Sequence, residues 1–246
     1  MTDFLSDAFG AAGRVAMRFY ARKLQRAGFS VTEARYTARY LQKFSFSVST
    51  IFDVGVYEGT PELYKAFPKC DLVLIDPLPE SLVLVEDVLN GRAHKYYQTA
   101  LGDSEGEATL SMSGPSSSLM ERIDGVQGEQ STRVRVTTLD AISAGHQGPF
   151  GLKIDTEGYE MEVLKGASKT LEQCEFVITE ASMRRRFSGG YAFSELIGLM
   201  ASHGFEAAEV ISHPRHNRLS DVLFVRKDSR HLEPKAVKVS KPGDRL

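Results

Sequence analysis

Ile51-Phe-Asp-Val-Gly-Val-Tyr-Glu-Gly-Thr-Pro61 is the stretch that decides the fold. An apolar run ends at Val54, two glycines follow four residues apart, and Thr60 and Pro61 are typical of a helix start. Glycine lets the backbone approach a ligand closely, and a helix N-terminus offers unpaired N–H groups. The stretch therefore predicts a strand and a helix joined either by a ligand-binding loop or by a purely structural turn.

The charges around this loop indicate which ligand it would take. The next apolar run ends at Asp76, where a carboxylate can accept both hydroxyls of a ribose. A dinucleotide site favours G-x-G-x-x-G, whereas this loop is G-x-x-x-G and contains Glu58, which would repel a pyrophosphate. S-adenosylmethionine carries an ammonium, a sulfonium and one carboxylate but no phosphate. Asp53 and Glu58 therefore favour that cofactor over a nicotinamide dinucleotide.

Short β-rich runs alternate with helical stretches along most of the chain. The β-rich runs are 51–54, 72–75, 96–101, 152–154, 176–179 and 222–225, and the helical stretches are 61–67, 79–90, 158–171 and 192–203. This alternation predicts an α/β fold with a doubly wound parallel sheet and helices on both faces. Between 102 and 148, the runs Glu107–Met112 and Arg133–Thr137 alternate like strands and predict an inserted β-hairpin.

The ends of the chain differ from this middle part. We expect an N-terminal helical extension over 1–45, a main domain over 46–227 and a polar, flexible tail over 228–246. Apolar residues recur at helical spacing from Phe4 to Leu24, in a segment rich in Lys and Arg. Such a helix can pack on the core with a solvated basic face, lie on an anionic membrane surface, or form a homodimer arm.

Composition narrows the class of protein. The 246 residues include 30 Lys and Arg against 32 Asp and Glu, a formal charge of −2, whereas a nucleic-acid binder is usually basic. The two cysteines cannot build a disulfide framework, no apolar run is long enough to span a membrane, and the N-terminal residues lack the apolar region and cleavage site expected of a signal peptide. These features favour a cytoplasmic α/β enzyme.

A second strand-to-helix junction, Leu152–Ala167, has an acidic loop. Asp155 and Glu157 would project from the carboxyl end of its strand, and Glu180 ends the next one. Asp155 or Thr156 could cap the helix. Alternatively, the acids could orient a substrate hydroxyl or act as general base, with Asp155 and Glu180 as oxygen ligands if Mg²⁺ were bound, although we expect no metal.

Three further motifs carry weaker signals. The run Met183–Arg186 follows Glu180 and would suit an anionic substrate group or a solvated loop. Ser116–Ser118 could bind a sugar or form a linker. His213 lies in a loop without zinc-ligand spacing, and we take it as the third candidate base after Asp155 and Glu157.

Together these stretches resemble the FkbM family of S-adenosylmethionine-dependent methyltransferases, from about Ile51 to Val225. The marks are Asp53-Val-Gly55-x-x-x-Gly59, Asp76-Pro77, Ala100-Leu101-Gly-Asp103 with Gly106, Ser116–Leu119, Val136-x-x-Leu139-Asp140, Leu152–Ala167, Glu180 and Leu223–Val225. Two positions depart from the family pattern, which usually shows Ala-Asn at Val56-Tyr57 and often Glu-Pro at Asp76-Pro77.

The resemblance implies a class I methyltransferase fold, Rossmann-like, with a mostly parallel seven-stranded sheet whose last strand is antiparallel. It implies O-methylation of a sugar, glycan or secondary metabolite. The implied cofactor site comprises Asp53, Gly55 and Gly59 around the methionyl part, Asp76 at the ribose, Ala100 and Leu101 at the adenine, and Asp155 at the methyl. Tyr57, Glu58 and Pro77 are further expected cofactor contacts. A nicotinamide-dependent oxidoreductase and a non-catalytic relative, which Tyr57 would favour, are the alternatives.

Overall fold

The computed structural model describes residues 11–28, 34–123, 128, 130–212 and 219–233. The chain divides into two compact units, 1–35 and 36–246. In the first unit, α2 (Ala11–Arg26) has Lys23 and Arg26 in its last turn, where positive charges interact favourably with the helix dipole. The division falls ten residues before the expected boundary at 45, because α3 (Ala38–Gln42) buries Leu41 in the core of the second unit.

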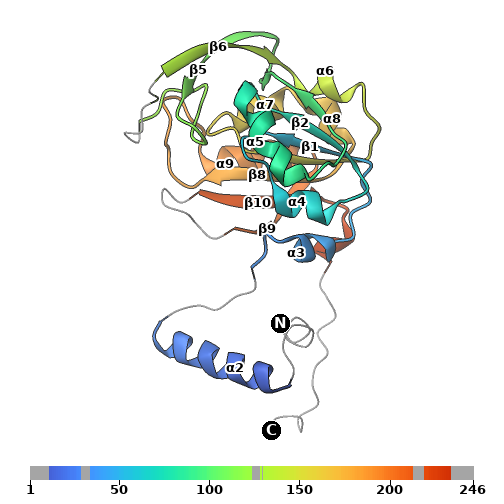
Figure 1. The fold of residues 1–246 in the computed structure, drawn as a ribbon, viewed down its shortest axis with the longest axis vertical. Helices are drawn as coiled ribbons and strands as arrows, with labels where there is room; N and C mark the ends of the chain where they lie inside the picture. The colour runs from blue at the N-terminus through green and yellow to red at the C-terminus, as the bar shows by residue number, and fades with distance from the viewer. Residues whose placement is uncertain (1–10, 29–33, 124–127, 129, 213–218, 234–246) are drawn as a thin grey trace. The chain divides into compact units, whose positions relative to one another are not determined.

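In the described part of the second unit, seven strands form the main sheet (Figure 1). Their spatial order is β3 (Lys95–Tyr97), β2 (Asp71–Ile75), β1 (Thr50–Val54), β7 (Phe150–Ile154), β8 (Cys174–Ser182), β10 (Leu219–Arg226) and β9 (Phe205–Val210). Neighbouring strands pair in parallel from β3 to β8, and β10 runs antiparallel to both β8 and β9. The expected mostly parallel sheet with an antiparallel last strand is confirmed.

Helices cover both faces of this sheet, as a doubly wound fold requires. One face packs against α6 (Leu139–Ser143), α7 (Glu160–Lys165), α8 (Ser168–Glu172) and α9 (Phe193–Ser202). The other packs against α3, α4 (Pro61–Ala66) and α5 (Pro79–Leu89). Successive strand residues point to opposite faces, so Phe52 and Val54 enter the first core while Ile51 enters the second.

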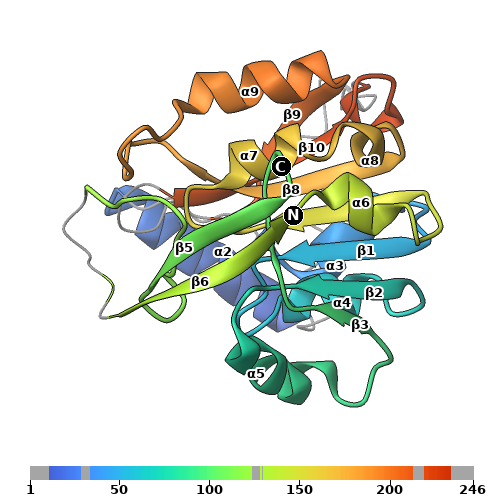
Figure 2. The ribbon, with the colours of Figure 1, turned by 90° about the horizontal axis from the view of Figure 1, so that it is seen from above.

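A smaller sheet lies beside the main one and corrects one expectation (Figure 2). It contains β4 (Ala100–Leu101), β6 (Gln130–Thr137) and β5 (Gly106–Met112), and the β5–β6 pair is the expected hairpin. The single strand predicted over 96–101 is instead split between β3 and β4. Thr99 stands at the crossing, where its hydroxyl donates to the Arg135 carbonyl at 3.0 Å.

The helix predicted over 158–171 is also split, into α7 and α8. Gly166 ends α7 against the loop after β4, where a Cβ atom would lie 2.0 Å from the Gly102 oxygen. The helices predicted over 61–67, 79–90 and 192–203 agree with α4, α5 and α9 to within one residue at each end, whereas α6 was not predicted. Within the described residues, no helix combines the length and the apolarity needed to span a bilayer.

Packing in the middle of the sheet predicts the effect of one added methyl group. A Cβ atom on Gly151 of β7 would lie 2.5 Å from both Ile51 Cδ1 and Phe176 Cζ, whereas a Cβ atom on Gly198 of α9 meets no atom within 4 Å. We expect Gly151→Ala to lower the free energy of unfolding by about 1–3 kcal/mol. The control Gly198→Ala should raise it by about 0.5–1 kcal/mol. Urea unfolding measures both, and equal effects would contradict this packing.

Candidate functional site

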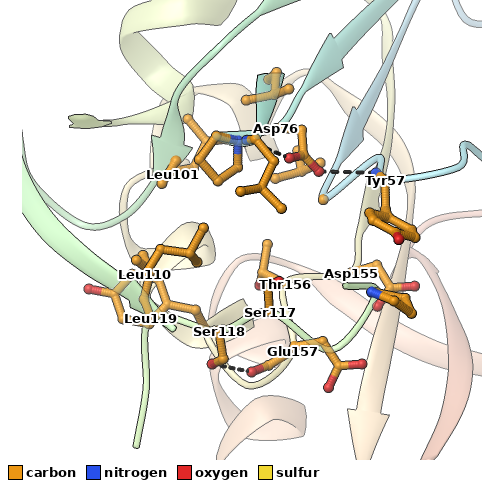
Figure 3. Close-up of a pocket in the computed structure, with 18 of the residues that line it drawn as sticks. Tyr57, Asp76, Leu101, Leu110, Ser117, Ser118, Leu119, Asp155, Thr156 and Glu157 are labelled. Carbon is orange, nitrogen blue, oxygen red and sulfur yellow. Dashed lines mark hydrogen bonds between the residues drawn. The ribbon is translucent and has the colours of Figure 1, made fainter. Parts of the chain in front are cut away.

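A crevice of about 590 Å³, including its open mouth, lies at the carboxyl ends of β1, β2 and β7 (Figure 3). Ligands of open α/β sheets bind at this edge. The β5–β6 connection supplies the opposite wall. The described lining residues are Val54, Gly55, Tyr57, Ile75, Asp76, Pro77, Leu78, Thr99, Ala100, Leu101, Leu110, Gly114, Pro115, Ser117, Ser118, Leu119, Asp155, Thr156, Glu157 and Tyr159.

Gly55 joins the two strand-end motifs at the floor of the crevice. Its φ of +76° is a left-handed conformation, and a Cβ atom there would lie 1.8 Å from the Asp155 carbonyl oxygen. The Gly55 N–H donates to the Ile75 carbonyl and the Asp155 N–H to the Val54 carbonyl, both at 2.9 Å. The glycine is therefore required for β1 and β7 to end side by side.

Asp76 is buried, and its carboxylate organises the β2 side of the crevice. One oxygen accepts the Tyr57 N–H at 3.0 Å and the other the Leu78 N–H at 2.9 Å (Figure 3). Burial raises the pKa of Asp76, while these two N–H donors act against that rise. The lone pairs not used by the backbone remain available to a ligand's hydroxyl groups.

The wall around Asp76 is apolar, and the whole lining is acidic. Figure 3 shows Leu101, Leu110 and Leu119 on the side opposite Tyr57. Among the described lining residues, three carry carboxyl groups and none is Lys, Arg or His. Such a crevice suits a ligand with an apolar ring, hydroxyl groups and positive charge, and its described lining has no basic side chain for a phosphate.

Asp155 follows β7 and is held by a lysine that the sequence had not singled out. The Lys153 ammonium lies 3.0 Å from Asp155 Oδ2 and 3.0 Å from Asp221 Oδ1. The side chains of Lys153 and Asp221 are 2% and 1% exposed, whereas that of Asp155 is 32% exposed. Of the two aspartates bound to Lys153, Asp155 is thus the one that can contact a ligand.

Asp53 does not line the crevice, which corrects the expected cofactor contact. Its side chain is fully buried on the α4 face of the sheet, where it accepts a hydrogen bond from the Tyr64 hydroxyl. Burial raises the pKa of Asp53 to about 6. Glu58 and Gly59 are also outside the lining: Glu58 is exposed, and Gly59 packs towards Val85 and Tyr64.

Glu157 reaches the crevice, but arginines hold its carboxylate. Oε2 lies 2.7 Å from Arg186 Nη2 and 3.4 Å from Arg122 Nη1. Both guanidinium groups also lie over the Phe187 ring, at 5.3 and 5.1 Å from its centroid. The Glu157 carbonyl accepts the Ser118 hydroxyl at 2.7 Å, so this residue ties the β5–β6 connection to the acidic loop (Figure 3).

Glu160, which the sequence had not singled out, shapes the same loop. Its buried carboxylate accepts the N–H groups of Thr156 and Gly158, at 3.2 and 3.0 Å, and the Tyr191 hydroxyl at 2.9 Å. The helix α7 starts after Tyr159 without a side-chain cap, so neither Asp155 nor Thr156 serves as its N-cap.

Glu180 lies in a separate cavity beside the crevice, with Glu160, Arg186 and Tyr191. Burial, and then the negative charges of Asp155 and Glu157, raise the pKa of Glu180, whose carboxylate lies 3.8 Å from Arg186 Nη1. The described residues contain no group of three His, Cys, Asp or Glu side chains that could hold a metal ion.

The structure brings together most of the residues chosen from the sequence. Those that line the crevice are Gly55, Tyr57, Asp76, Pro77, Ala100, Leu101, Asp155 and Glu157. His213 lies outside the described residues. The sequence missed Lys153, Arg122 and Arg186 as partners of the acids. Strand alternation could have identified Lys153, since it puts residues 153 and 155 on the same face. The run Met183–Arg186 pointed to Arg186, but as a contact for an anionic substrate group or a solvated loop rather than for Glu157, and nothing local signals Arg122.

The chain is similar to one known protein family and to several solved structures. The profile described as Methyltransferase FkbM domain matches residues 53–207. No curated protein sequence matches the chain. Similar solved structures include cofactor-bound Rv0187 from MTB, at 11% identity and TM-score 0.47 over 92% of this chain and 95% of that one. Magnesium protoporphyrin IX methyltransferase (ChlM) from Synechocystis PCC 6803 with bound SAM has 9% identity and TM-score 0.45, over 89% and 85%.

The raised pKa of Asp53 predicts a pH-dependent loss of stability. The folded protein holds this proton up to about pH 6, whereas the unfolded chain releases it near pH 4, so stability falls as the pH rises between these values. Two pH units correspond to about 3 kcal/mol. We expect the free energy of unfolding of Asp53→Asn, relative to that of the wild type, to rise by that amount between pH 4 and pH 7. Urea unfolding at each pH measures it. Asp71→Asn, on the exposed end of β2, is the control. A difference in stability between Asp53→Asn and wild type that does not change with pH would contradict the raised pKa of Asp53.

Proposed function

The chain belongs to the FkbM family of methyltransferases, and from this premise we propose that it methylates a hydroxyl group of a sugar, glycan or secondary metabolite. The match spans residues 53–207 and confirms the sequence prediction of an S-adenosylmethionine-dependent methyltransferase. The observation that carries the proposal is the acidic crevice, whose described lining lacks any basic side chain and includes Asp155.

The residues of the crevice fit the cofactor. Asp76 has free lone pairs for ribose hydroxyls, and the apolar side chains of Leu78, Leu101 and Leu110 suit an adenine ring. Tyr57 lines the crevice without filling it, so its replacement of the family's usual Asn does not argue for a non-catalytic relative.

The nicotinamide-dependent alternative is not supported by this lining. A dinucleotide presents a pyrophosphate, which needs N–H donors or basic side chains. Here the described lining has no basic side chain and contributes the carboxylates of Asp76 and Asp155, while that of Glu157 is bound by two arginines. Like charges at close range oppose such a ligand, whereas a sulfonium and an ammonium are attracted.

When bound, S-adenosylmethionine supplies an electrophilic methyl group on a good leaving group. The protein then has two tasks, to hold the acceptor oxygen in line and to remove its proton. We assign the second task to Asp155, whose carboxylate is partly open to the crevice. Glu157 is a weaker candidate because two buried arginines neutralise it and hold its oxygens. Its role is to fix the loop that carries Asp155.

Cofactor binding tests the first half of the proposal. By calorimetry we expect wild-type protein to bind S-adenosylhomocysteine and not NAD. Asp76→Ala should weaken binding about 100-fold, because two hydrogen bonds to a charged group contribute about 1.5 kcal/mol each. Asp71→Ala, on the exposed end of the same strand, is the matched control. Binding of NAD, or unaltered affinity in Asp76→Ala, would count against the site.

Turnover tests the assignment of Asp155. The acceptor can be found by offering labelled S-adenosylmethionine with panels of glycans and hydroxylated secondary metabolites. With an acceptor in hand, Asp155→Asn should lower turnover by about 10²–10⁴-fold while S-adenosylhomocysteine affinity stays nearly the same. Asp87→Asn, an exposed position on α5, should have no effect. Undiminished turnover would exclude Asp155 as the base.

A further inference from the structure

One wall of the crevice is formed by residues 113–123, a segment after β5 that we call the strap. Five residues of the strap line the crevice: Gly114, Pro115, Ser117, Ser118 and Leu119. Figure 3 shows Ser117, Ser118 and Leu119 at this wall. The contacts that hold the strap in place therefore decide how far the wall can move away from a ligand in the crevice.

The strap begins as a tight turn that is fastened to β5. Ser111 at the end of β5 and Ser118 exchange two backbone hydrogen bonds, at 2.9 and 3.0 Å. Inside the turn, the Ser117 hydroxyl accepts the Ser113 N–H at 2.9 Å and donates to the Gly114 carbonyl at 2.7 Å. These bonds tie the turn to the small sheet, whereas the cofactor motifs belong to the main sheet.

Glu157 fastens the strap to the acidic loop after β7. The Ser118 hydroxyl donates to the Glu157 carbonyl at 2.7 Å (Figure 3). Arg122 Nη1 lies 3.4 Å from Glu157 Oε2, and it also donates to the Ser116 carbonyl at 3.1 Å. The backbone and the side chain of Glu157 thus both hold the strap.

The end of the strap pairs with the segment that follows β8. The Ile123 N–H donates to the Arg186 carbonyl and the Ser188 N–H to the Glu121 carbonyl, both at 2.8 Å. The Arg186 side chain binds the same oxygen of Glu157 that Arg122 approaches, at 2.7 Å. One carboxylate therefore bridges an arginine of the strap and an arginine of the segment with which the strap is paired.

The backbone at this bridge is in a conformation that side chains rarely adopt. Glu157 has a φ of +50°, in the left-handed region that is uncommon for residues other than glycine. Gly158 follows with a φ of +102°, and a Cβ atom on it would lie 2.3 Å from Phe187 Cδ2. Residues held in sparsely populated conformations cluster at ligand clamps and switch regions. The strained Glu157 thus lies where a clamp would need to be held.

We propose that Glu157, Arg122 and Arg186 form a latch that closes the strap over the cofactor and sets the rate of cofactor exchange. This role rests on the proposed function, since the ligand that exchanges is S-adenosylmethionine or its product S-adenosylhomocysteine. Polar contacts suit a latch because water can replace each partner when the strap opens, whereas separating apolar surfaces exposes both of them to water. Closing loops of this kind limit ligand exchange in many enzymes.

Cofactor exchange can be measured without an acceptor. The full chain is mixed with radiolabelled S-adenosylmethionine, and uptake of the label gives the association rate constant. Loss of label after addition of excess unlabelled S-adenosylhomocysteine gives the dissociation rate constant. In Arg122→Met we expect both constants to rise about 10-fold, because a hydrogen bond to a charged group stabilises a contact by at least that factor. The dissociation constant should change much less, since the latch closes with and without ligand.

Two further variants complete the test. Arg133→Met is the matched control, because Arg133 belongs to the same small sheet but forms an exposed pair with Glu107, and it should exchange at wild-type rates. Ser118→Ala removes only a hydroxyl that holds the Glu157 carbonyl, and both constants should rise about 3-fold, as for the loss of one neutral hydrogen bond. This variant decides the question if Arg122→Met does not fold.

The ratio of the two rate constants separates a latch from a merely structural wall. Faster dissociation with unchanged association would mean that the strap contributes contacts to the bound cofactor, and it would overturn the latch. Wild-type rates in Arg122→Met and Ser118→Ala, or faster exchange in Arg133→Met, would overturn it too. If the wild-type chain takes up no S-adenosylmethionine, the proposed function fails and the latch with it. Uptake with unaltered exchange in the variants removes the latch alone.

Discussion

The close approach of two backbones, at Gly55 and Asp155, is the constraint on which the site depends. No side chain fits between them, since a Cβ atom on Gly55 would lie 1.8 Å from the Asp155 oxygen. Because β1 and β7 are parallel neighbours, their loops leave the sheet at the same edge. The glycine loop, the Asp76 carboxylate and the acidic loop consequently face one crevice, although about a hundred residues separate the first from the last.

Burying charged groups beside this crevice costs desolvation free energy, which the fold offsets by giving each buried carboxylate a partner. Isolated ions are poorly tolerated in a protein interior, and each buried carboxylate here has a partner of a different kind. Asp53 has the Tyr64 hydroxyl, Asp221 has Lys153, and Glu160 has two backbone N–H groups and Tyr191. The partners fix the directions of the acids, which a solvated site could not do. Rigid placement is what a methyl transfer requires, because the acceptor must be held in line.

The fold and the crevice were predictable from the sequence to the extent that they depend on periodicity and on strand ends. Alternating strands and helices predict a doubly wound sheet, and residues that follow parallel strands must share an edge, so Asp76 and Asp155 were found. Asp53 was misplaced because it lies inside β1, where the side chain points to the α4 face. The split of 96–101 between two sheets, and the arginines on Glu157, depend on contacts between segments distant in the sequence. No local sequence pattern predicts such contacts.

The acidic loop shows how environment separates two similar residues. Asp155 and Glu157 are two positions apart, and both reach the crevice. Glu157, 13% exposed, forms ion pairs with two guanidinium groups that also lie over Phe187, so its charge serves to hold the wall of the crevice together. Asp155, 32% exposed, meets one ammonium that Asp221 also binds, so part of its charge stays available to a ligand. The cations that contact each acid, rather than its place in the motif, therefore distinguish the two, and they support the proposal that Asp155 is the base.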